Sequence, residues 1–446
     1  MRIKRLVRID PNIFSVEISN VIRVENMKSS FFMEKRLDDA ETKALIASNI
    51  IDVSGAEPIK DGVIIVDGER ITEVGHRSET QIPSGAKIID LGKKTLMPGM
   101  IDAHLHLTGA RSYNPAESIF TPHDLQVLRA FEDCLKLLSA GFTTVRDCGS
   151  SIALSLKKGI EEGAIPGPRI YASGRPLSQT AGHGDIHYLP REEVISHGVL
   201  LCDGPEECRR AAREALRDGA DFIKISTSGG VGSEKDNPWE AQFTVDEIKA
   251  ITYEAHNVGK RVASHAQGAQ GVKNAIIGGV DSIEHGYFLD EECVELMLKH
   301  KIYYVPTFAL IEAYKRSVQT PYDMPPWRLR KQRMCIEAMP KSLIMAYEAG
   351  VKIATGPDYF GAPLRAHGDN ADELIAMVKY GMKPMDVIVA ATKNAAECIG
   401  ISEMVGVLAP GKLADIIALD GNPLEDIESV KRVAFVMKSG SIFLNR

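Results

Sequence analysis

Two histidines lie one residue apart in the stretch "GMIDAHLHLTG", residues 99–109. Alternate side chains of a β-strand project to the same face, so His104 and His106 would point in one direction. Imidazole is a frequent ligand of transition metals, but buried histidines satisfied by hydrogen bonds are also common. The stretch alone leaves two interpretations open, a pair of metal ligands or a pair of core histidines.

Four further residues that can do chemistry lie at the ends of short apolar runs later in the chain. They are Lys224 in "FIKISTSGG", His265 in "VASHAQG", His285 in "SIEHG" and Asp358 in "ATGPD". The first two intervals each match one β/α unit, and the last matches two units with a long insertion. Each residue also has an ordinary alternative, as a core histidine, a helix N-cap or a lysine that reaches solvent. Their joint placement at strand ends indicates one site shared with the histidine pair.

A lysine among metal ligands requires a chemical change. A free ammonium group has a pKa near about 10.4 and cannot bind a cation. Burial beside cations favours the neutral amine, which can react with carbon dioxide to give a carbamate. The product is a carboxylate on a long arm, which suits it to bridging two metal ions. Lys224 therefore fits the set only if it is carbamylated.

The elements that would position these residues are eight strand-like runs between about residues 96 and 400. Runs such as "GFTTVRDCG" and "VKIATGPD" alternate with segments such as "PEECRRAAREALRDG", in which apolar residues recur at helical spacing. This alternation predicts a TIM-like (β/α)8 barrel, whose catalytic groups lie at the carboxyl ends of the strands. A doubly wound open sheet is the competitor, but the sequence has no Gly-x-Gly-x-x-Gly turn to support it.

Apolar and polar residues alternate at both ends of the chain, as in "DGVIIVDGERITEVG" and "RVAFVMKSGSIFLN". We expect these strands to pair as a small β-sandwich domain, which makes the fold class α/β. The expected division is an N-terminal extension of unknown role (1–40), the first part of the sandwich (41–95), the barrel (96–403) and the second part of the sandwich (404–446).

The composition is that of a globular protein with a large core. The chain has 446 residues, of which 44% are hydrophobic and 25% are charged, and its net charge is −7. This balance gives no support to a nucleic-acid surface and favours a small-molecule substrate. Seven cysteines without a Cys-x-x-Cys pair, no signal-peptide core and no apolar run of membrane length predict a soluble, cytoplasmic protein with reduced thiols.

These motifs together resemble the amidohydrolase superfamily, over roughly residues 43–440. The resemblance rests on "HLH" after "PGMID" and on Lys224, His265, His285 and Asp358. Two longer strings, "SGRPLSQTAGHGD" (173–185) and "KISTSGGVGSEKDNPWEAQF" (224–243), are similar to one branch. That branch holds Xaa-Pro dipeptidases, carboxypeptidases that act on Xaa-Lys or Xaa-Arg, and ochratoxin-hydrolysing amidases. The resemblance implies a binuclear zinc-dependent hydrolase that cleaves the amide bond to a C-terminal amino acid.

The resemblance also implies a role for each ligand. Zinc would be bound at one position by His104, His106 and Asp358, and at a second by His265 and His285, with carbamylated Lys224 bridging. Other divalent metals could replace zinc. Asp358 would accept a proton from the attacking water and deliver it to the leaving amine. The sequence departs from many relatives at Pro357, where they have threonine, and this puts the local positioning of Asp358 in question.

Substrate contacts are predicted from residues near these strand ends. His183 in "TAGHGD" would donate to the substrate carbonyl or carboxylate during catalysis, or else it would order its loop. Gly229 and Gly230 would let the backbone approach a ligand closely, or would simply form a tight turn. Tyr287 is either a substrate contact or a packing aromatic.

Two further pairs of residues have expected roles near the same site. Arg146 and Asp147 in "TTVRDCG" are expected to pair with each other at the mouth of the second strand. Arg365 and His367 follow Asp358, and each either binds an anionic group or faces solvent.

The expected partner is a small peptide or N-acyl amino acid, and the resemblance implies a homo-oligomer, with an octamer as one form. A second possible activity is hydrolysis of a cyclic amide or imidazolone, or of a phosphoester, on the same metals. A third interpretation is a non-catalytic scaffold, which would be expected to lack ligands. This chain keeps all of the matching residue types, which favours an enzyme.

Overall fold

The computed structural model describes residues 41–446 except 115–116, 118–119, 188, 197 and 320–323. The predicted N-terminal extension, residues 1–40, therefore lies outside the described residues.

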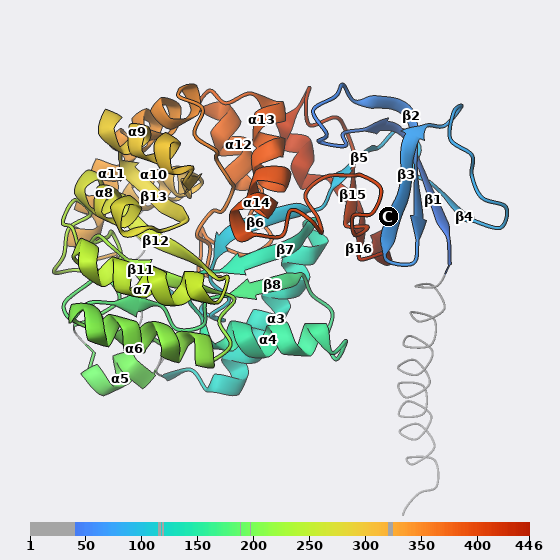
Figure 1. Cartoon of the computed structure of the whole chain (residues 1–446). Helices are drawn as coiled ribbons and strands as arrows, with labels where there is room; N and C mark the ends of the chain where they lie inside the picture. The colour runs from blue at the N-terminus through green and yellow to red at the C-terminus, as the bar shows by residue number, and fades with distance from the viewer. Residues whose placement is uncertain (1–40, 115–116, 118–119, 188, 197, 320–323) are drawn as a thin grey trace, which may run out of the picture.

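Parallel strands form the body of the molecule (Figure 1). In chain order they are β6 (Met100–Leu105), β7 (Phe142–Asp147), β8 (Arg169–Ala172), β9 (Leu177–Ser178), β10 (Leu200–Leu201), β11 (Phe222–Ser226), β12 (Arg261–Gly268), β13 (Ser282–Phe288) and β14 (Tyr303–Val305). Strands β6, β7 and β8 pair in order, and β9 pairs with β11, which begins the run through β12 and β13 to β14. The Ala172 carbonyl at the end of β8 accepts a hydrogen bond from Asp221 N at 2.8 Å, just before β11. Strands β8 and β9 therefore both adjoin β11, and β9 also pairs with β10.

The ring closes through residues 351–359, which lie between β14 and β6. This segment forms isolated parallel bridges, from Ile353 to Tyr304 on one side and from Tyr359 to Leu105 on the other. It therefore takes the place of the eighth strand, although it pairs too irregularly to form a continuous one. The fold class predicted from the sequence, an α/β chain with a TIM-like barrel, is confirmed.

Helices surround the barrel, and their buried faces follow the predicted spacing. They are α3 (His123–Ser139), α4 (Ser151–Glu161), α5 (Arg191–Ser196), α6 (Gly204–Arg217), α7 (Val245–Asn257), α8 (Ala269–Gly278), α9 (Glu291–His300), α10 (Leu310–Gln319), α11 (Pro326–Glu348), α12 (Asp372–Lys379), α13 (Pro384–Val389) and α14 (Ala395–Ile399). In α6 the buried residues Cys208, Ala211, Ala212 and Ala215 form one stripe. The long insertion expected between His285 and Asp358 contains α10 and α11.

Both chain ends contribute strands to one further sheet. These strands are β1 (Lys43–Ile50), β2 (Ile59–Asp67), β3 (Arg70–His76), β4 (Lys87–Asp90), β5 (Thr95–Pro98), β15 (Ile416–Leu419), β16 (Val433–Lys438) and β17 (Ser441–Asn445). Their order is β17-β16-β15-β5-β1-β2-β3, with β4 beside β1, so the two ends of the chain meet where β15 pairs with β5. Side chains from both ends, including Leu45, Leu96 and Phe435, pack into a shared core.

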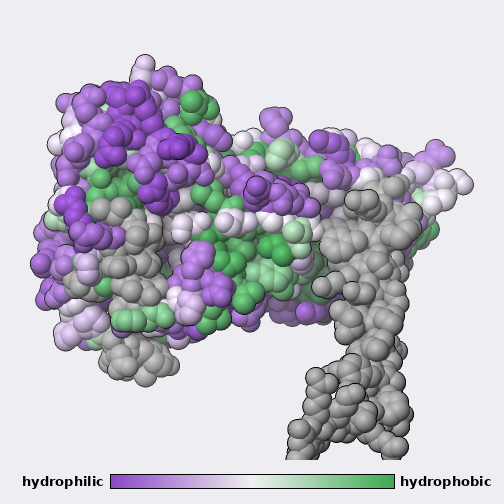
Figure 2. Space-filling view, turned by 90° about the horizontal axis from the view of Figure 1, so that it is seen from below, coloured by the Kyte–Doolittle hydropathy of each residue, from purple (hydrophilic) through white to green (hydrophobic). Residues whose placement is uncertain are grey.

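The surface seen from below carries hydrophilic side chains over most of its left part and a hydrophobic area near its middle (Figure 2). In the part of the chain that the structure describes, we find no helix with the length and apolarity needed to span a bilayer.

Candidate metal centre

Six side chains proposed as metal ligands line one cavity of about 410 Å³ at the carboxyl ends of the strands. They are His104 on β6, His106 just beyond it, Lys224 on β11, His265 on β12, His285 on β13, and Asp358 in the segment that closes the barrel. The parallel barrel brings these residues together because each one lies on, or just after, a barrel segment that opens on the same rim. Residues more than 250 positions apart in the sequence thus face one space.

The first group in this cavity consists of His104, His106 and Asp358. Oδ1 of Asp358 lies 3.6 Å from Nε2 of His104 and 3.2 Å from Nε2 of His106. The three ligand atoms all lie within 4.8 Å of one another. His104 Nε2 is buried and has no hydrogen-bond partner among the described residues. A buried nitrogen without a partner is costly, and a metal ion at this point would satisfy it.

The second group consists of His265 and His285, whose ring centroids are 4.4 Å apart. Nδ1 of His285 hydrogen-bonds to Thr307 Oγ1 at 2.9 Å, which leaves its Nε2 available. Nε2 of His265 donates to the Gly229 carbonyl at 3.2 Å, which leaves its Nδ1 available. Burial lowers the pKa of both imidazoles well below the usual value, so both rings are neutral, the form that binds metals.

Lys224 lies between these groups and is only 5% exposed. The pKa of His104 is lowered to about 4, mainly by burial and to a smaller extent by the positive charge of Lys224. Within the described residues the Lys224 ammonium group forms no salt bridge, and an unmodified lysine would place a buried positive charge beside imidazoles, with Asp147 and Glu284 as opposing charges. A carbamate at this position would remove that charge and add a carboxylate, so the residues present fit a metal pair.

Asp358 is held in an unusual backbone conformation, with φ of +58°, and His285 has φ of +76°. Such angles are uncommon outside glycine and are often found at functional sites. Asp358 N donates to the His104 carbonyl at 2.9 Å, so the position of Asp358 does not depend on a donor at Pro357. Burial would raise the pKa of Asp358, but the hydrogen bond from His106 and the neighbouring imidazoles hold it well below its usual range.

Glu284 orients His104 from behind and was not predicted from the sequence. Nδ1 of His104 donates to Glu284 Oε2 at 2.7 Å, and Arg146 binds Glu284 Oε1 at 2.7 Å. Burial would raise the pKa of Glu284, but Arg146 and His104 hold it well below its usual range. A carboxylate that accepts from a metal-ligating histidine fixes the tautomer and the ring direction.

The expected pairing of Arg146 with Asp147 is wrong. Arg146 pairs with Glu284, whereas Asp147 accepts hydrogen bonds from Leu107 N and Gly149 N at 2.6 and 3.0 Å. Successive side chains of a strand point to opposite faces, so two neighbours on β7 cannot meet.

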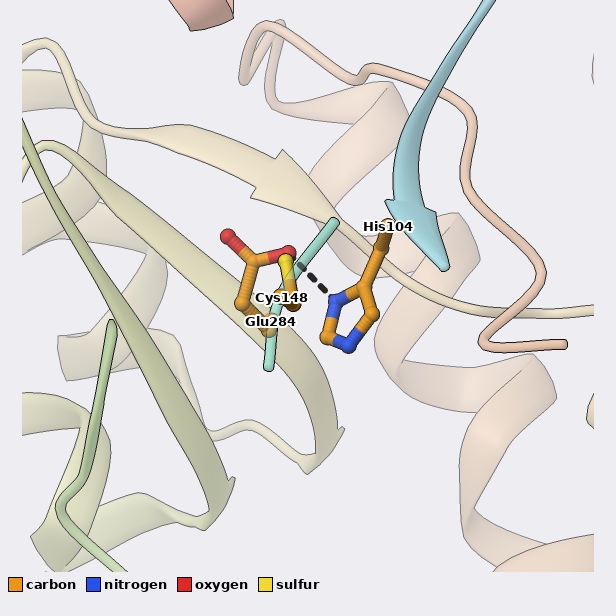
Figure 3. A group of neighbouring side chains, drawn as sticks. All are labelled: His104, Cys148 and Glu284. Atoms are coloured by element: carbon orange, nitrogen blue, oxygen red, sulfur yellow. Dashed lines mark hydrogen bonds and ion pairs between the residues drawn. The ribbon is translucent and has the colours of Figure 1, made fainter. Parts of the chain in front are cut away.

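Cys148 lies beside His104 and Glu284 (Figure 3), and these three residues also bring ligand atoms within 4.8 Å of one another. Burial raises the pKa of the Cys148 thiol, which keeps it protonated and makes it a poor ligand. Nδ1 of His104 already donates to Glu284. This cluster therefore supports the His104 ring, whose other nitrogen, Nε2, remains available to a ligand.

His183 lines the cavity and stacks on His265, with ring centroids 4.1 Å apart and planes at 16°. Its Nδ1 lies 2.9 Å from Ser233 Oγ, and Ser233 also hydrogen-bonds to Asp236. Its backbone N–H donates to Gln242 Oε1 at 2.8 Å. The loop after β11 therefore holds both the ring and the backbone of His183.

The two predicted glycines of this loop permit close packing against protein atoms. A Cβ atom on Gly230 would lie 2.3 Å from His183 Cε1, and one on Gly229 would lie 2.3 Å from the Asn237 carbonyl oxygen. The residues that line the cavity include Val231 and Gly232, but neither Gly229 nor Gly230. Here glycine allows the loop to approach His183.

Tyr287 is buried behind His285. Its hydroxyl lies 2.8 Å from Thr307 Oγ1, the same atom that binds His285 Nδ1. Tyr287 is not among the residues that line the cavity, so this placement fits the packing alternative. His367 is also buried and its Nε2 donates to the His106 carbonyl at 3.1 Å, so it does not face solvent.

Lys331 on α11 supports the loop that follows β11. The sequence does not predict this role. Its side chain is 1% exposed, and its ammonium group donates to the carbonyls of Gly230 at 3.1 Å and Ser233 at 2.6 Å, and to that of Asp236. The inserted helix thereby fixes the loop that holds His183. Lys331 lies in a run of basic residues at the start of a long helix, which ordinarily predicts only a solvated face, so this role depends on the tertiary structure.

This chain is similar to known hydrolases over most of its length. The model of the amidohydrolase family matches residues 95–443. The sequence is 38% identical over 436 residues to ochratoxinase from Aspergillus niger, covering 91% of this chain and 87% of that protein. The crystal structure of a Xaa-Pro dipeptidase with methionine bound in its active site has 33% identity and a TM-score of 0.83, covering 91% of this chain and all of that one. A prolidase complexed with N-methylphosphonate-L-proline has 34% identity and a TM-score of 0.84, with coverage of 91% and 100%.

Proposed function

This chain belongs to the amidohydrolase family, and we propose that it hydrolyses the amide bond to a C-terminal amino acid. The substrate would be a dipeptide, an N-acyl amino acid or an ochratoxin-type amide. One observation carries the proposal, the convergence of His104, His106, Lys224, His265, His285 and Asp358 on one cavity. The similarity to ochratoxinase and to prolidases supports this chemistry over hydrolysis of a cyclic amide or a phosphoester.

We propose that the cavity holds two zinc ions. His104, His106 and Asp358 would hold one ion, His265 and His285 would hold the other, and carbamylated Lys224 would contact both. When bound, such a pair lowers the pKa of a water molecule and polarises a substrate carbonyl. The mixture of nitrogen and oxygen ligands also suits other divalent metals.

The protein residues then have separable tasks. Asp358 is a carboxylate at neutral pH, so it can accept the proton of the attacking water and pass it to the leaving nitrogen. Ser233 holds Nδ1 of His183, which leaves Nε2 to donate to a substrate carbonyl or carboxylate. Glu284 keeps the His104 ring in place throughout. The cavity of about 410 Å³ falls within the range of small-molecule sites.

The proposal is tested with the full-length protein purified in the presence of zinc and bicarbonate. A library of dipeptides and N-acyl amino acids, varied at the C-terminal residue, is incubated with the protein, and released amino acids are measured by mass spectrometry. We expect release from a defined subset and none above background with the Asp358→Asn variant. No release across the library from a metal-loaded protein would contradict the proposed function.

We also propose that the protein is a homo-oligomer, with the octamer as the form implied by its branch. Phe120 is 82% exposed and Leu128 is 64% exposed, near the start of α3, and exposed apolar groups often mark interfaces. Light scattering coupled to gel filtration measures the mass directly. A monomer at micromolar concentration would contradict the assembly without affecting the proposed reaction.

A further inference from the structure

Arg365 is a buried cation at the cavity wall that the proposed reaction leaves without a task. Along the chain it lies in the segment that connects Asp358 to α12. Its side chain lines the cavity, although the residue is only 5% exposed. Its backbone is fixed in a turn, because Arg365 N donates to the Ala362 carbonyl and its own carbonyl accepts from Gly361 N, both at 3.0 Å. The arginine is therefore presented by a defined loop and does not extend into solvent.

Aromatic rings surround the guanidinium group. Its central carbon lies 5.4 Å from the ring centroids of Tyr314 and Phe360 and 5.7 Å from that of Tyr113. Rings at this distance stabilise the cation through their faces. The Tyr113 hydroxyl is in addition a hydrogen-bond partner of the guanidinium group. The arrangement holds the guanidinium group in place and leaves its Nε without an acceptor among the described residues.

The charge of Arg365 is incompletely matched by the protein. Nη1 lies 3.8 Å from Asp358 Oδ2, which is beyond hydrogen-bonding distance. Nε is buried and has no hydrogen-bond partner among the described residues. A buried cation with unused donors costs free energy unless a ligand supplies the acceptors.

The position of Arg365 relative to Asp358 identifies the ligand group. Oδ1 of Asp358 faces His104 and His106, whereas Oδ2 faces Arg365. In the proposed reaction, on which this inference rests, Asp358 delivers a proton to the leaving nitrogen. In an α-amino acid only the α-carbon separates that nitrogen from the carboxylate, so the carboxylate can reach the neighbouring arginine.

We propose that Arg365 binds the free α-carboxylate of the leaving amino acid and makes the enzyme specific for an unblocked C-terminus. Arginine and carboxylate form charge-assisted, paired hydrogen bonds that a neutral amide cannot reproduce. A carboxamide or ester in the same place would leave the buried guanidinium group unpaired. Sites that reject a substrate in this way discriminate by about 100-fold or more.

The inference is tested by comparing an N-acyl amino acid with its C-terminal carboxamide. The wild-type protein, Arg365→Gln and Arg328→Gln are assayed for kcat/KM with both compounds, and their metal content is measured. Arg328 is the matched control, because it lines the same cavity and its guanidinium carbon lies 5.3 Å from the Tyr113 ring, but it is on α11. We expect the wild type and R328Q to prefer the free acid by about 100-fold or more, and R365Q to lose that preference with its metal content unchanged.

Binding is measured in parallel by calorimetry with Asp358→Asn, which does not require turnover. We expect the acid to bind D358N much more tightly than the carboxamide, and the double variant D358N/R365Q to bind both weakly. Equal binding of acid and carboxamide, an unchanged preference in R365Q, or an equal loss in R328Q would overturn the role of Arg365. If R365Q does not fold, the binding preference of D358N alone decides. Absence of hydrolysis with this binding preference intact would instead contradict the proposed function.

Discussion

The cavity has two sides that are built in different ways. The strand side consists of residues on or just after the barrel strands, namely His104, His106, Lys224, His265, His285 and Asp358. The loop side consists of His183, the loop 229–242, Lys331 on α11 and Arg365. On the strand side, Glu284 of the barrel holds His104 at 2.7 Å, and the loop contributes the Gly229 carbonyl that accepts from His265. On the loop side, contacts between distant connecting segments hold the residues, as Lys331 holds the carbonyls of Gly230 and Ser233.

This difference separates the tasks of the two sides. The strand side is buried and hydrogen-bonded, which suits ligands whose geometry must not change during a reaction. The loop side can vary with little effect on the barrel, which suits the recognition of particular substrates. We therefore expect substitutions on the strand side to stop hydrolysis, and substitutions on the loop side to change substrate preference or rate more modestly.

The largest effect is expected from Asp358→Asn on the strand side. The amide keeps the shape of the side chain but cannot accept the proton of the attacking water. We expect kcat to fall by about 1,000-fold or more, because the change removes both an acid–base group and a proposed metal ligand. Steady-state assays measure the loss, and circular dichroism checks the fold. Retention of a tenth of the wild-type rate would argue against the strand side as the catalytic one.

The next effect is expected from Glu284→Gln, which changes the support of the strand side. This substitution weakens the hold on His104 and leaves Arg146 without its buried carboxylate. We expect zinc affinity to fall by about 10–100-fold and the free energy of unfolding to fall by about 3–5 kcal/mol. Chelator competition and urea unfolding measure the two effects.

Glu132→Gln is the matched control for Glu284, because its pairing with Lys136 is on the surface, with side chains 57% and 45% exposed. Surface pairs contribute about 1 kcal/mol or less. If both variants lose zinc equally, the contact between Glu284 and His104 does not explain the loss.

A smaller effect is expected from Lys331→Met on the loop side. Three backbone carbonyls lose their donor, and the loop that holds His183 loosens. We expect kcat/KM to fall by about tenfold with the metal content unchanged, since Lys331 donates to loop carbonyls and to none of the six proposed ligands. Lys341→Met, at an exposed position of the same helix, is the control and should behave as wild type. Loss of metal from K331M would show that the two sides are not separable.

The smallest effect on activity is expected from Arg169→Met, between the barrel and the sheet of the chain ends. Arg169 Nη1 lies 2.8 Å from Asp415 Oδ2, remote from the cavity. We expect the free energy of unfolding to fall by about 1–3 kcal/mol while kcat/KM at 25 °C stays within twofold. Thermal unfolding and steady-state assays test this pair of results, and a large loss of activity with little loss of stability would contradict it.

The strand side could be predicted from the sequence because its geometry follows from local rules. Side chains two apart on a strand share a face, and the ends of parallel strands share a rim, so His104 and His285 could be brought together without a structure. The apolar run "VKIATGPD" also predicts the eighth strand, although residues 351–359 pair with their neighbours through isolated bridges.

The loop side and the supporting contacts could not be predicted in the same way. Glu284 lies next to His285 in the sequence but reaches His104, and that contact depends on how β13 and β6 face each other. Arg146 pairs with Glu284 and not with its sequence neighbour Asp147, because proximity along a strand does not mean contact. Lys331 and Arg365 lie in segments without a periodic pattern, so only the tertiary structure shows that both are buried beside the cavity.

The most direct test of the account is the metal content of the protein purified with zinc and bicarbonate, compared with that of Lys224→Ala. Mass spectrometry of the metals should find about two ions per chain in the wild type, as a bridged pair requires, and at most one in K224A. With carbon-13 bicarbonate, a carbamate signal should appear in the NMR spectrum of the wild type and be absent from that of K224A. A wild-type protein without stoichiometric metal, or K224A with a full metal complement and undiminished hydrolysis, would contradict the proposed centre.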